Sequence, residues 1–133
     1  HPLEDLLPLV ETDPQAPDLA RLPGRKVLLS NGPAHYCAAV LTRLGIDRHF
    51  SAQFGLEHIR FAPKPSPHGF RAVLSRLRAR PGQSWMIEDS ADNLKTAKRL
   101  GLNTVWLAPG EPRRPAYVDH RLNRLSDLVR LVR

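Results

Sequence analysis

The chain has 133 residues, one cysteine and a formal net charge of +7. This length is enough for one domain with its own hydrophobic core. A single cysteine excludes an internal disulfide and favours a reducing, cytoplasmic location. The sequence has no apolar run of the roughly eighteen residues that a membrane span needs, so we expect no membrane partner.

The positive charge raises the question of nucleic-acid binding. Arginines are scattered singly along the chain, as at Arg21, Arg43 and Arg121, and aromatic residues do not alternate with them. Only residues 76–80 are locally dense in arginine, which is typical of a solvated helix face. We therefore expect no nucleic-acid partner.

Residues 1–24 are rich in proline and acidic side chains. The prolines allow at most a short helix at about residues 15–22, and Pro23 with Gly24 marks a turn. We interpret residues 1–24 as a connection that enters a core of residues 25–133. Because the chain begins with His1 and its only methionine is Met86, we expect that another segment precedes it.

The first predicted strand covers residues 26–31 and ends in Ser30 and Asn31. Gly32 and Pro33 lead into a helix that closes at a glycine, Gly45, and carries its apolar residues at helical spacing. Amide groups at such a helix start suit a phosphate. The alternative is that Ser30 and Asn31 only cap the helix.

After a short edge strand and a loop within residues 47–62, Lys64 stands between Pro63 and Pro65. The two prolines hold this segment extended, so the lysine side chain should project from a stiff backbone. Ser66 is a predicted N-cap, and the helix that follows has an apolar inner face of Phe70, Val73, Leu74 and Leu77.

A second buried strand, residues 85–87, ends at the adjacent carboxylates Glu88 and Asp89. The next helix ends near Gly101. In open α/β sheets ligands bind outside the carboxyl ends of the strands, so we expect a site here. Asp89 or Ser90 can cap this helix, and the alternative is that the two acids, Glu88 and Asp89, are only a capping cluster.

Strands at residues 103–108 and 118–122 and a closing helix from Leu125 complete the chain. Alternating strands and helices of this kind predict an α/β fold, a Rossmann-like doubly wound, mostly parallel sheet with helices on both faces.

The strand and loop ends together offer a hydroxyl and an amide, an ammonium group and two carboxylates. Such carboxylates suit Mg²⁺, which prefers oxygen ligands and keeps waters. A lysine and a hydroxyl suit phosphate oxygens, and phosphoryl transfer depends on positioning and charge stabilisation of this kind. No histidine or cysteine pair has the spacing of a zinc site.

At these positions the sequence resembles the haloacid dehalogenase (HAD) superfamily of phosphohydrolases. The similar segments are KVLLSNG, PKPSPHGF and WMIEDSADNLKTAKRLGLNTVWL, in the family's order and within about residues 24–132. The variants SN, KP and EDSADN look most like the pyrimidine 5′-nucleotidase branch.

The resemblance implies roles for individual residues. Ser30 would bind the phosphoryl group with Asn31 and the Gly32 amide nearby. Lys64 would stabilise the charge of phosphate and nucleophile. Asp89 would bind Mg²⁺, Glu88 would be a second ligand directly or through water, and Asn93 would support them.

The chain departs from the family because it has no apolar strand ending in Asp-x-Asp, the motif that carries the nucleophile and the general acid. The cap that selects the substrate is missing as well. In the family fold that strand lies between the strands that end at Ser30 and Asp89, so its absence would leave a gap in the sheet.

These observations predict the C-terminal portion of a Mg²⁺-dependent phosphatase that hydrolyses a small phosphorylated metabolite through an aspartyl-phosphate, with a nucleoside 5′-monophosphate as one candidate substrate. The 133 residues alone are predicted to be inactive. A separate N-terminal fragment or a homodimer would then complete the sheet. The alternative is a non-catalytic domain that binds phosphate, a nucleotide or a protein partner.

Overall fold

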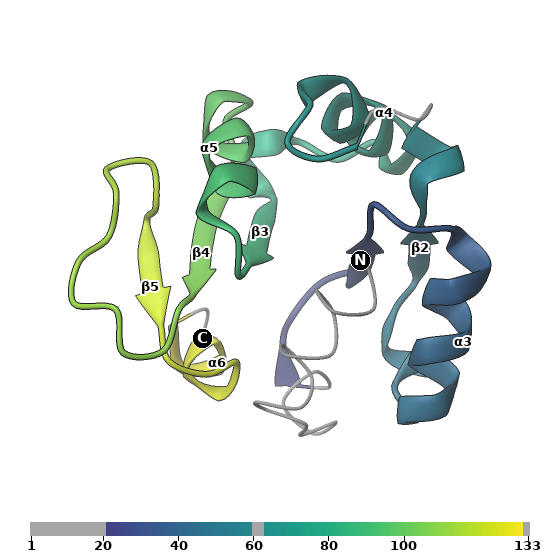
Figure 1. The fold of residues 1–133 in the computed structure, drawn as a ribbon, viewed down its shortest axis with the longest axis horizontal. Coiled ribbons are helices and arrows are strands. Elements are labelled where there is room, and N and C mark those ends of the chain that lie inside the picture. Colours follow the sequence, from purple (N-terminus) through teal and green to yellow (C-terminus); the bar gives the residue numbers. More distant parts are fainter. Residues whose placement is uncertain (1–20, 60–62, 132–133) are drawn as a thin grey trace.

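The computed structural model describes residues 21–59 and 63–131. The strands and helices alternate in the predicted order (Figure 1). They are β1 (Val27–Leu29), α3 (Ala34–Leu44), β2 (Ala52–Phe54), α4 (Pro67–Leu77), β3 (Trp85–Glu88), α5 (Ala91–Arg99), β4 (Asn103–Leu107), β5 (His120–Leu122) and α6 (Ser126–Leu131), with short 3₁₀ helices at Asp47–His49, Leu56–Ile59 and Pro81–Gln83.

Local sequence signals account for several element boundaries. The Ser66 side chain accepts a hydrogen bond from the His68 amide and Pro67 is the first residue of α4, as predicted. Gly45 ends α3 at a φ of 72°, in the left-handed region that glycine enters without strain. Pro33 lies one residue before α3 rather than in its first turn, because its extended backbone makes it the N-cap.

The described strands form two parallel sheets, one of β1 and β2 and one in the order β3-β4-β5. Val27 pairs with Ala52, Trp85 with Asn103, and Val105 with His120. The parallel α/β class predicted from the sequence is therefore confirmed.

Among the described residues, β1 and β3 each have one edge that pairs with no strand. The Ser30 amide donates to the Phe54 carbonyl, so Ser30 faces β2. Peptide groups alternate in direction along a strand, and those of Leu29 therefore face the unpaired edge. Within the described residues, β1 and β3 thus belong to different sheets, and the absence of a strand between them stays a prediction.

Helices cover both faces of these sheets. Leu28 packs with Leu41 of α3, whereas its neighbours Val27 and Leu29 pack with Val73 of α4 on the other face. In the second sheet, Met86 packs toward α4 and α5 and Ile87 packs toward α6. The sheet is therefore doubly wound, as predicted.

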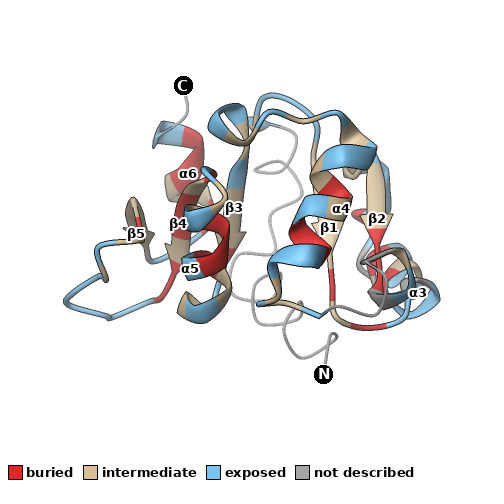
Figure 2. Cartoon of the chain, turned by 90° about the horizontal axis from the view of Figure 1, so that it is seen from above, coloured by how far each residue is buried: buried red, intermediate tan, exposed pale blue. Residues whose placement is uncertain are grey.

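Helix α4 connects the two halves of the fold, which are the half around the β1-β2 sheet and the half around the β3-β4-β5 sheet. Its Phe70, 3% exposed, lies in a cluster that contains both Leu29 of β1 and Met86 of β3. Figure 2 shows buried residues on β4, α5 and α6 in one half and on β2 and α4 in the other. The core is therefore continuous through α4.

The expectation that β3 is buried on both faces is wrong for its first residue. Trp85 is 40% exposed, and its ring stacks on His120 with 6.1 Å between centroids. The strand becomes more buried toward Glu88, and its second residue, Met86, already packs against Phe70 of α4 and Ala97 of α5.

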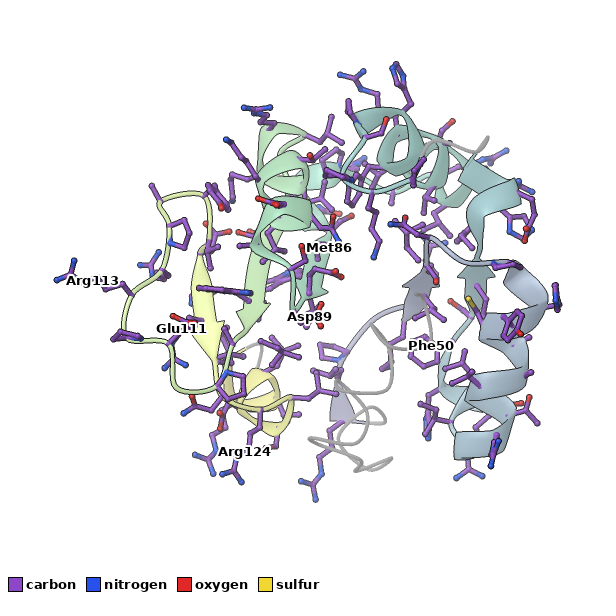
Figure 3. The ribbon with its side chains drawn as sticks, in the orientation of Figure 1. Phe50, Met86, Asp89, Glu111, Arg113 and Arg124 are labelled. Carbon is purple, nitrogen blue, oxygen red and sulfur yellow. The ribbon has the colours of Figure 1, made fainter. Side chains whose placement is uncertain are left out.

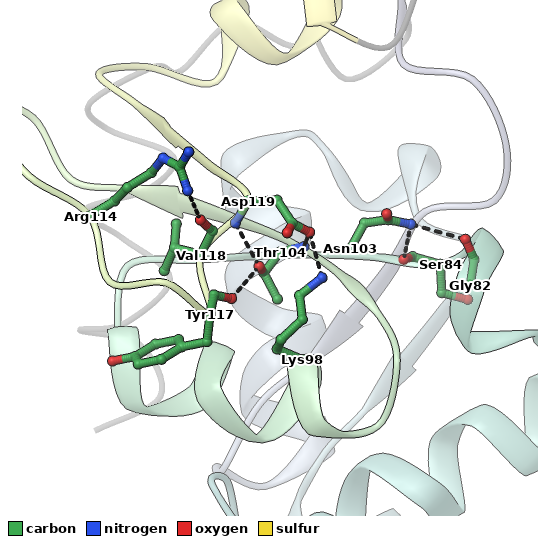
Figure 4. A network of polar contacts seen from close by, with 9 residues as sticks. All are labelled: Gly82, Ser84, Lys98, Asn103, Thr104, Arg114, Tyr117, Val118 and Asp119. Atoms are coloured by element: carbon green, nitrogen blue, oxygen red, sulfur yellow. Dashed lines mark hydrogen bonds and ion pairs between the residues drawn. The ribbon is translucent and has the colours of Figure 1, made fainter.

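A polar network holds the loop before β5 against the start of β4 (Figure 4). Asp119 accepts hydrogen bonds from Lys98 Nζ at 2.7 Å and from the Thr104 amide at 2.9 Å. Desolvation opposes ionisation of Asp119, but these bonds and the charge of Lys98 outweigh it and lower the pKa of the carboxyl.

Two sequence predictions fall largely outside the described residues: the connecting segment 1–24 and its short helix. Within the described part of the chain, no helix has the length and apolar character to cross a membrane.

Candidate functional site

The site is built around the Lys64 ammonium group. Its Nζ donates to the Leu29 carbonyl at 3.2 Å and lies 3.4 Å from Glu88 Oε2. Leu29 is the last residue of β1 and Glu88 the last of β3, so one side chain connects the carboxyl ends of the two sheets. The Lys64 side chain is only 5% exposed.

Asn31 holds the backbone of Lys64 in place. Its Oδ1 accepts from the Lys64 amide at 2.7 Å, and its Nδ2 donates to the Lys64 carbonyl at 3.2 Å. Both ends of the side-chain amide therefore bond the lysine backbone, and one of the two Nδ2 hydrogens makes no hydrogen bond to a described residue.

Ser30 follows Leu29, whose carbonyl accepts from Lys64, and is 7% exposed. Its Oγ accepts a hydrogen bond from the Gly32 amide at 3.1 Å. The Gly32 amide is therefore directed at Ser30, whereas the Ser30 hydroxyl proton has no acceptor among the described residues. That proton suits an oxygen of a bound anion.

Glu88 is the buried counter-ion of Lys64. Its side chain is 10% exposed, and its other oxygen, Oε1, accepts from Asn93 Nδ2 at 2.7 Å. Burial raises the pKa of Glu88, although the charge of Lys64 and the Asn93 hydrogen bond act in the opposite direction. The predicted proximity of Glu88, Asn93 and Lys64 is thus observed.

Asp89 is exposed, and no hydrogen bond to its carboxylate occurs within residues 21–59 and 63–131. Figure 3 places Asp89 at the end of β3 on the side of β1, whereas Arg113 on the loop before β5 extends away from it. The Trp106 indole donates to the Asp89 carbonyl at 2.8 Å and holds this residue at the strand end.

These carboxylates fit a magnesium ion but not a metal that needs a full set of protein ligands. The described residues contain no group of three or more His, Cys, Asp or Glu side chains arranged to hold a metal. Mg²⁺ is commonly held by one or two carboxylates and completes its shell with water and phosphate oxygens. Asp89 offers such a carboxylate directly, while both Glu88 oxygens already accept hydrogen bonds.

The capping alternatives find no support in the hydrogen bonds. The N-cap of α3 is Pro33, and neither Ser30 nor Asn31 bonds the helix amides as a cap. The N-cap of α5 is Ser90, whose side chain makes no capping hydrogen bond. Glu88 bonds side chains, not helix amides.

One polar contact of the site was not anticipated from the sequence. Thr96 Oγ1 donates to the Pro65 carbonyl at 2.5 Å, next to Lys64 in the chain. Thr96 lies three residues after Asn93 on α5, so a polar residue on the same helix face was the available signal.

With this geometry established, the comparison with known proteins is informative. The model of a family described as haloacid dehalogenase-like hydrolases matches residues 3–101. The chain belongs to this family. The three HAD motifs identified from the sequence begin within the matched region, and each contributes to the Lys64 site.

Individual HAD relatives include phosphatases and dehalogenases. The phosphoglycolate phosphatase of Salmonella choleraesuis is 32% identical over 83 residues, which are 62% of this chain and 32% of that protein. A solved dehalogenase structure with an intermediate complex has a TM-score of 0.80 and 26% sequence identity, and the matched region covers 88% of this chain and 54% of the dehalogenase chain. A HAD phosphatase from Thermococcus onnurineus has a TM-score of 0.76 and 25% sequence identity, and the matched region covers 86% of this chain and 54% of the phosphatase chain.

These comparisons support the assignment of this chain to the HAD-like hydrolase family and its α/β fold. The chain spans about a third of the length of the curated relatives it matches and about half of the solved ones.

Proposed function

We propose that these residues form the phosphate-binding half of a phosphomonoester hydrolase that uses Mg²⁺. One observation carries this proposal: a buried ammonium group, Lys64, contacts the last residues of two strands. One of these strands leads into Ser30, whose hydroxyl proton has no acceptor among the described residues, and the other leads into the exposed carboxylate of Asp89. Lys64 and Ser30 would bind the phosphoryl oxygens. Similarity to phosphoglycolate phosphatase supports a small phosphorylated metabolite as substrate, and a nucleoside 5′-monophosphate is one candidate.

Asp89 would hold Mg²⁺ directly, with Glu88 as a second ligand or acting through water. When bound, the ion supplies positive charge to the phosphoryl oxygens. Asn93 would keep Glu88 oriented toward Lys64, as it does here.

The nucleophile of the proposed aspartyl-phosphate route would come from outside this chain, because its sequence contains no apolar strand that ends in Asp-x-Asp. Glu88 is held by Lys64 and Asn93, and Asp89 is assigned to the ion. The edges of β1 and β3 that pair with no described strand could bind a strand that carries it. By this proposal residues 1–133 alone bind phosphate but do not turn it over.

Dehalogenation is the second candidate reaction, because one similar solved structure is a dehalogenase. The exposed Asp89 argues for phosphate. A halide leaving group carries one negative charge, whereas a phosphate dianion needs more than one cation to balance it, and Asp89 can hold the second.

The first test is calorimetric titration of the chain with inorganic phosphate, with and without Mg²⁺. We expect Mg²⁺ to tighten phosphate binding, Lys64→Met to abolish binding, and Asp89→Asn to remove only the effect of Mg²⁺. Lys95→Met and Asp92→Asn are matched controls, because both residues are exposed on α5. Unchanged binding by Lys64→Met would refute the site.

The second test measures turnover of p-nitrophenyl phosphate and 2-chloropropionate by the natural protein that contains these residues. Lys64→Met and Asp89→Asn should each lower kcat/KM for the phosphate ester by at least about a hundredfold. Faster release of chloride than of phosphate would assign a dehalogenase. Phosphate binding with neither turnover would assign a non-catalytic binding domain.

A further inference from the structure

The segment around Lys64 is held from two sides. The Asn31 side chain, from the loop after β1, bonds both the amide and the carbonyl of Lys64. From the other half of the fold, the Thr96 hydroxyl of α5 donates to the carbonyl of Pro65 at 2.5 Å. The lysine backbone is thus attached to both halves.

We propose that Thr96 is a positioning residue that, together with Asn31, sets the place of the Lys64 ammonium group relative to Glu88. The inference deepens the proposed function, because it rests on Lys64 as the phosphate-binding cation.

The argument begins with the flexibility of lysine. A lysine carries its charge on a four-carbon chain with many rotamers. Holding Lys64 Nζ at both the Leu29 carbonyl and Glu88 therefore requires a fixed backbone. Asn31 fixes that backbone relative to β1, but it cannot fix it relative to β3, where the counter-ion lies.

Helix α5 fixes the segment around Lys64 relative to β3. Asn93 and Thr96 are three residues apart and therefore lie on the same face of the helix. Asn93 bonds Glu88, and Thr96 bonds the residue after Lys64. The two partners of the ion pair are thus tied to one rigid helix turn, which sets the distance between them.

The character of Thr96 fits this role. The residue is 8% exposed and β-branched, so its hydroxyl has few rotamers to choose from. Pro65 is an exposed residue, and its carbonyl bonds a hydroxyl of a buried residue on α5. The bond therefore attaches an exposed segment of the chain to a packed helix.

Selective acetylation of lysine amines, quantified by peptide mass spectrometry, tests the inference. The chain has four lysines, and Lys95 is exposed and serves as the internal reference. We expect Lys64 to react slowly in the wild type. Thr96→Val should speed Lys64 acetylation about fivefold relative to Lys95, the factor for losing one hydrogen bond.

Two variants sharpen the comparison. Thr96→Ser keeps the hydroxyl and should restore slow acetylation of Lys64. Thr42→Val makes the same chemical change at an exposed position on α3 and should leave the rate unchanged. If valine is not accommodated at residue 96, Thr96→Ala compared with Thr96→Ser gives the same contrast.

An unchanged Lys64 rate in folded Thr96→Val, checked by circular dichroism, would overturn the inference. An equal acceleration of all four lysines would also overturn it, because it would indicate general loosening. Adding phosphate and Mg²⁺ separates the two proposals. If phosphate does not protect Lys64 but Thr96→Val still exposes it, the phosphate-binding role fails and the positioning role stands.

Discussion

Replacing Asn93 by alanine tests the electrostatics of the buried ion pair most directly. Asn93 Nδ2 donates to Glu88 Oε1 at 2.7 Å, and the Glu88 side chain is 10% exposed. A hydrogen bond to a charged group contributes about 1.5–3 kcal/mol, so Asn93→Ala should lower the free energy of unfolding by about 2 kcal/mol at neutral pH.

The size of this loss should depend on pH. Burial raises the pKa of Glu88 above its ordinary value of 4.5. Above 4.5 the unfolded chain releases the proton before the folded chain does, so the free energy of unfolding falls as pH rises through this window. Below 4.5 Glu88 is protonated in both states, and Asn93→Ala removes only a neutral hydrogen bond of about 1 kcal/mol.

Urea unfolding of the wild type and Asn93→Ala, at neutral pH and at about pH 3, measures the difference. Asn103→Ala is the matched control, because its amide donates to the neutral carbonyls of Gly82 and Ser84 at 3.1 Å. Its effect should be the same at both pH values. Equal losses at both pH values for Asn93→Ala as well would refute a charged Glu88 as its partner.

Three further changes test the core, the polar network and a backbone turn. Phe70→Ala should lower the free energy of unfolding by about 3–5 kcal/mol in urea denaturation, whereas Leu131→Ala, 37% exposed, should change it by less than about 1 kcal/mol. Asp119→Asn removes the ion pair with Lys98 and should cost about 0.5–1 kcal/mol at neutral pH. Because the folded pKa of Asp119 is lowered, this difference should vanish as pH falls below 3.8 and through that pKa; a constant difference would contradict it. A Cβ added at Gly45 meets no atom within 4 Å, so Gly45→Ala introduces only the strain of a φ of 72°. The free energy of unfolding measured by thermal denaturation should therefore fall by about 1 kcal/mol. A much larger fall would indicate that the added methyl group makes an unfavourable contact.

Local patterns were sufficient to predict the order of strands and helices. Ser66 with Pro67 marks the start of α4, and Gly45 marks the end of α3, because caps and turns depend on the conformation of one or two residues. The boundary of β5 was placed two residues early: Val118 is fully buried, but the strand begins only at His120. Burial alone does not distinguish a strand from the loop that leads into it.

The site residues were also accessible from the sequence, since the carboxyl ends of neighbouring strands meet at one edge of a sheet. By this rule Ser30 and Glu88 were predicted to share a site, and the stiff loop between Pro63 and Pro65 added Lys64 to it. The family membership follows from the same segments.

Tertiary structure alone decided what each polar group bonds. Asn31 was expected near the phosphate, yet its amide is taken by the Lys64 backbone, and Thr96 was not anticipated at all. Hydrogen bonds between residues more than thirty positions apart depend on distances that only the packed fold defines. The sequence by itself therefore determined the chemical groups and the strand ends that carry them, and the packing of α4 and α5 decided which of those groups remain available to a ligand.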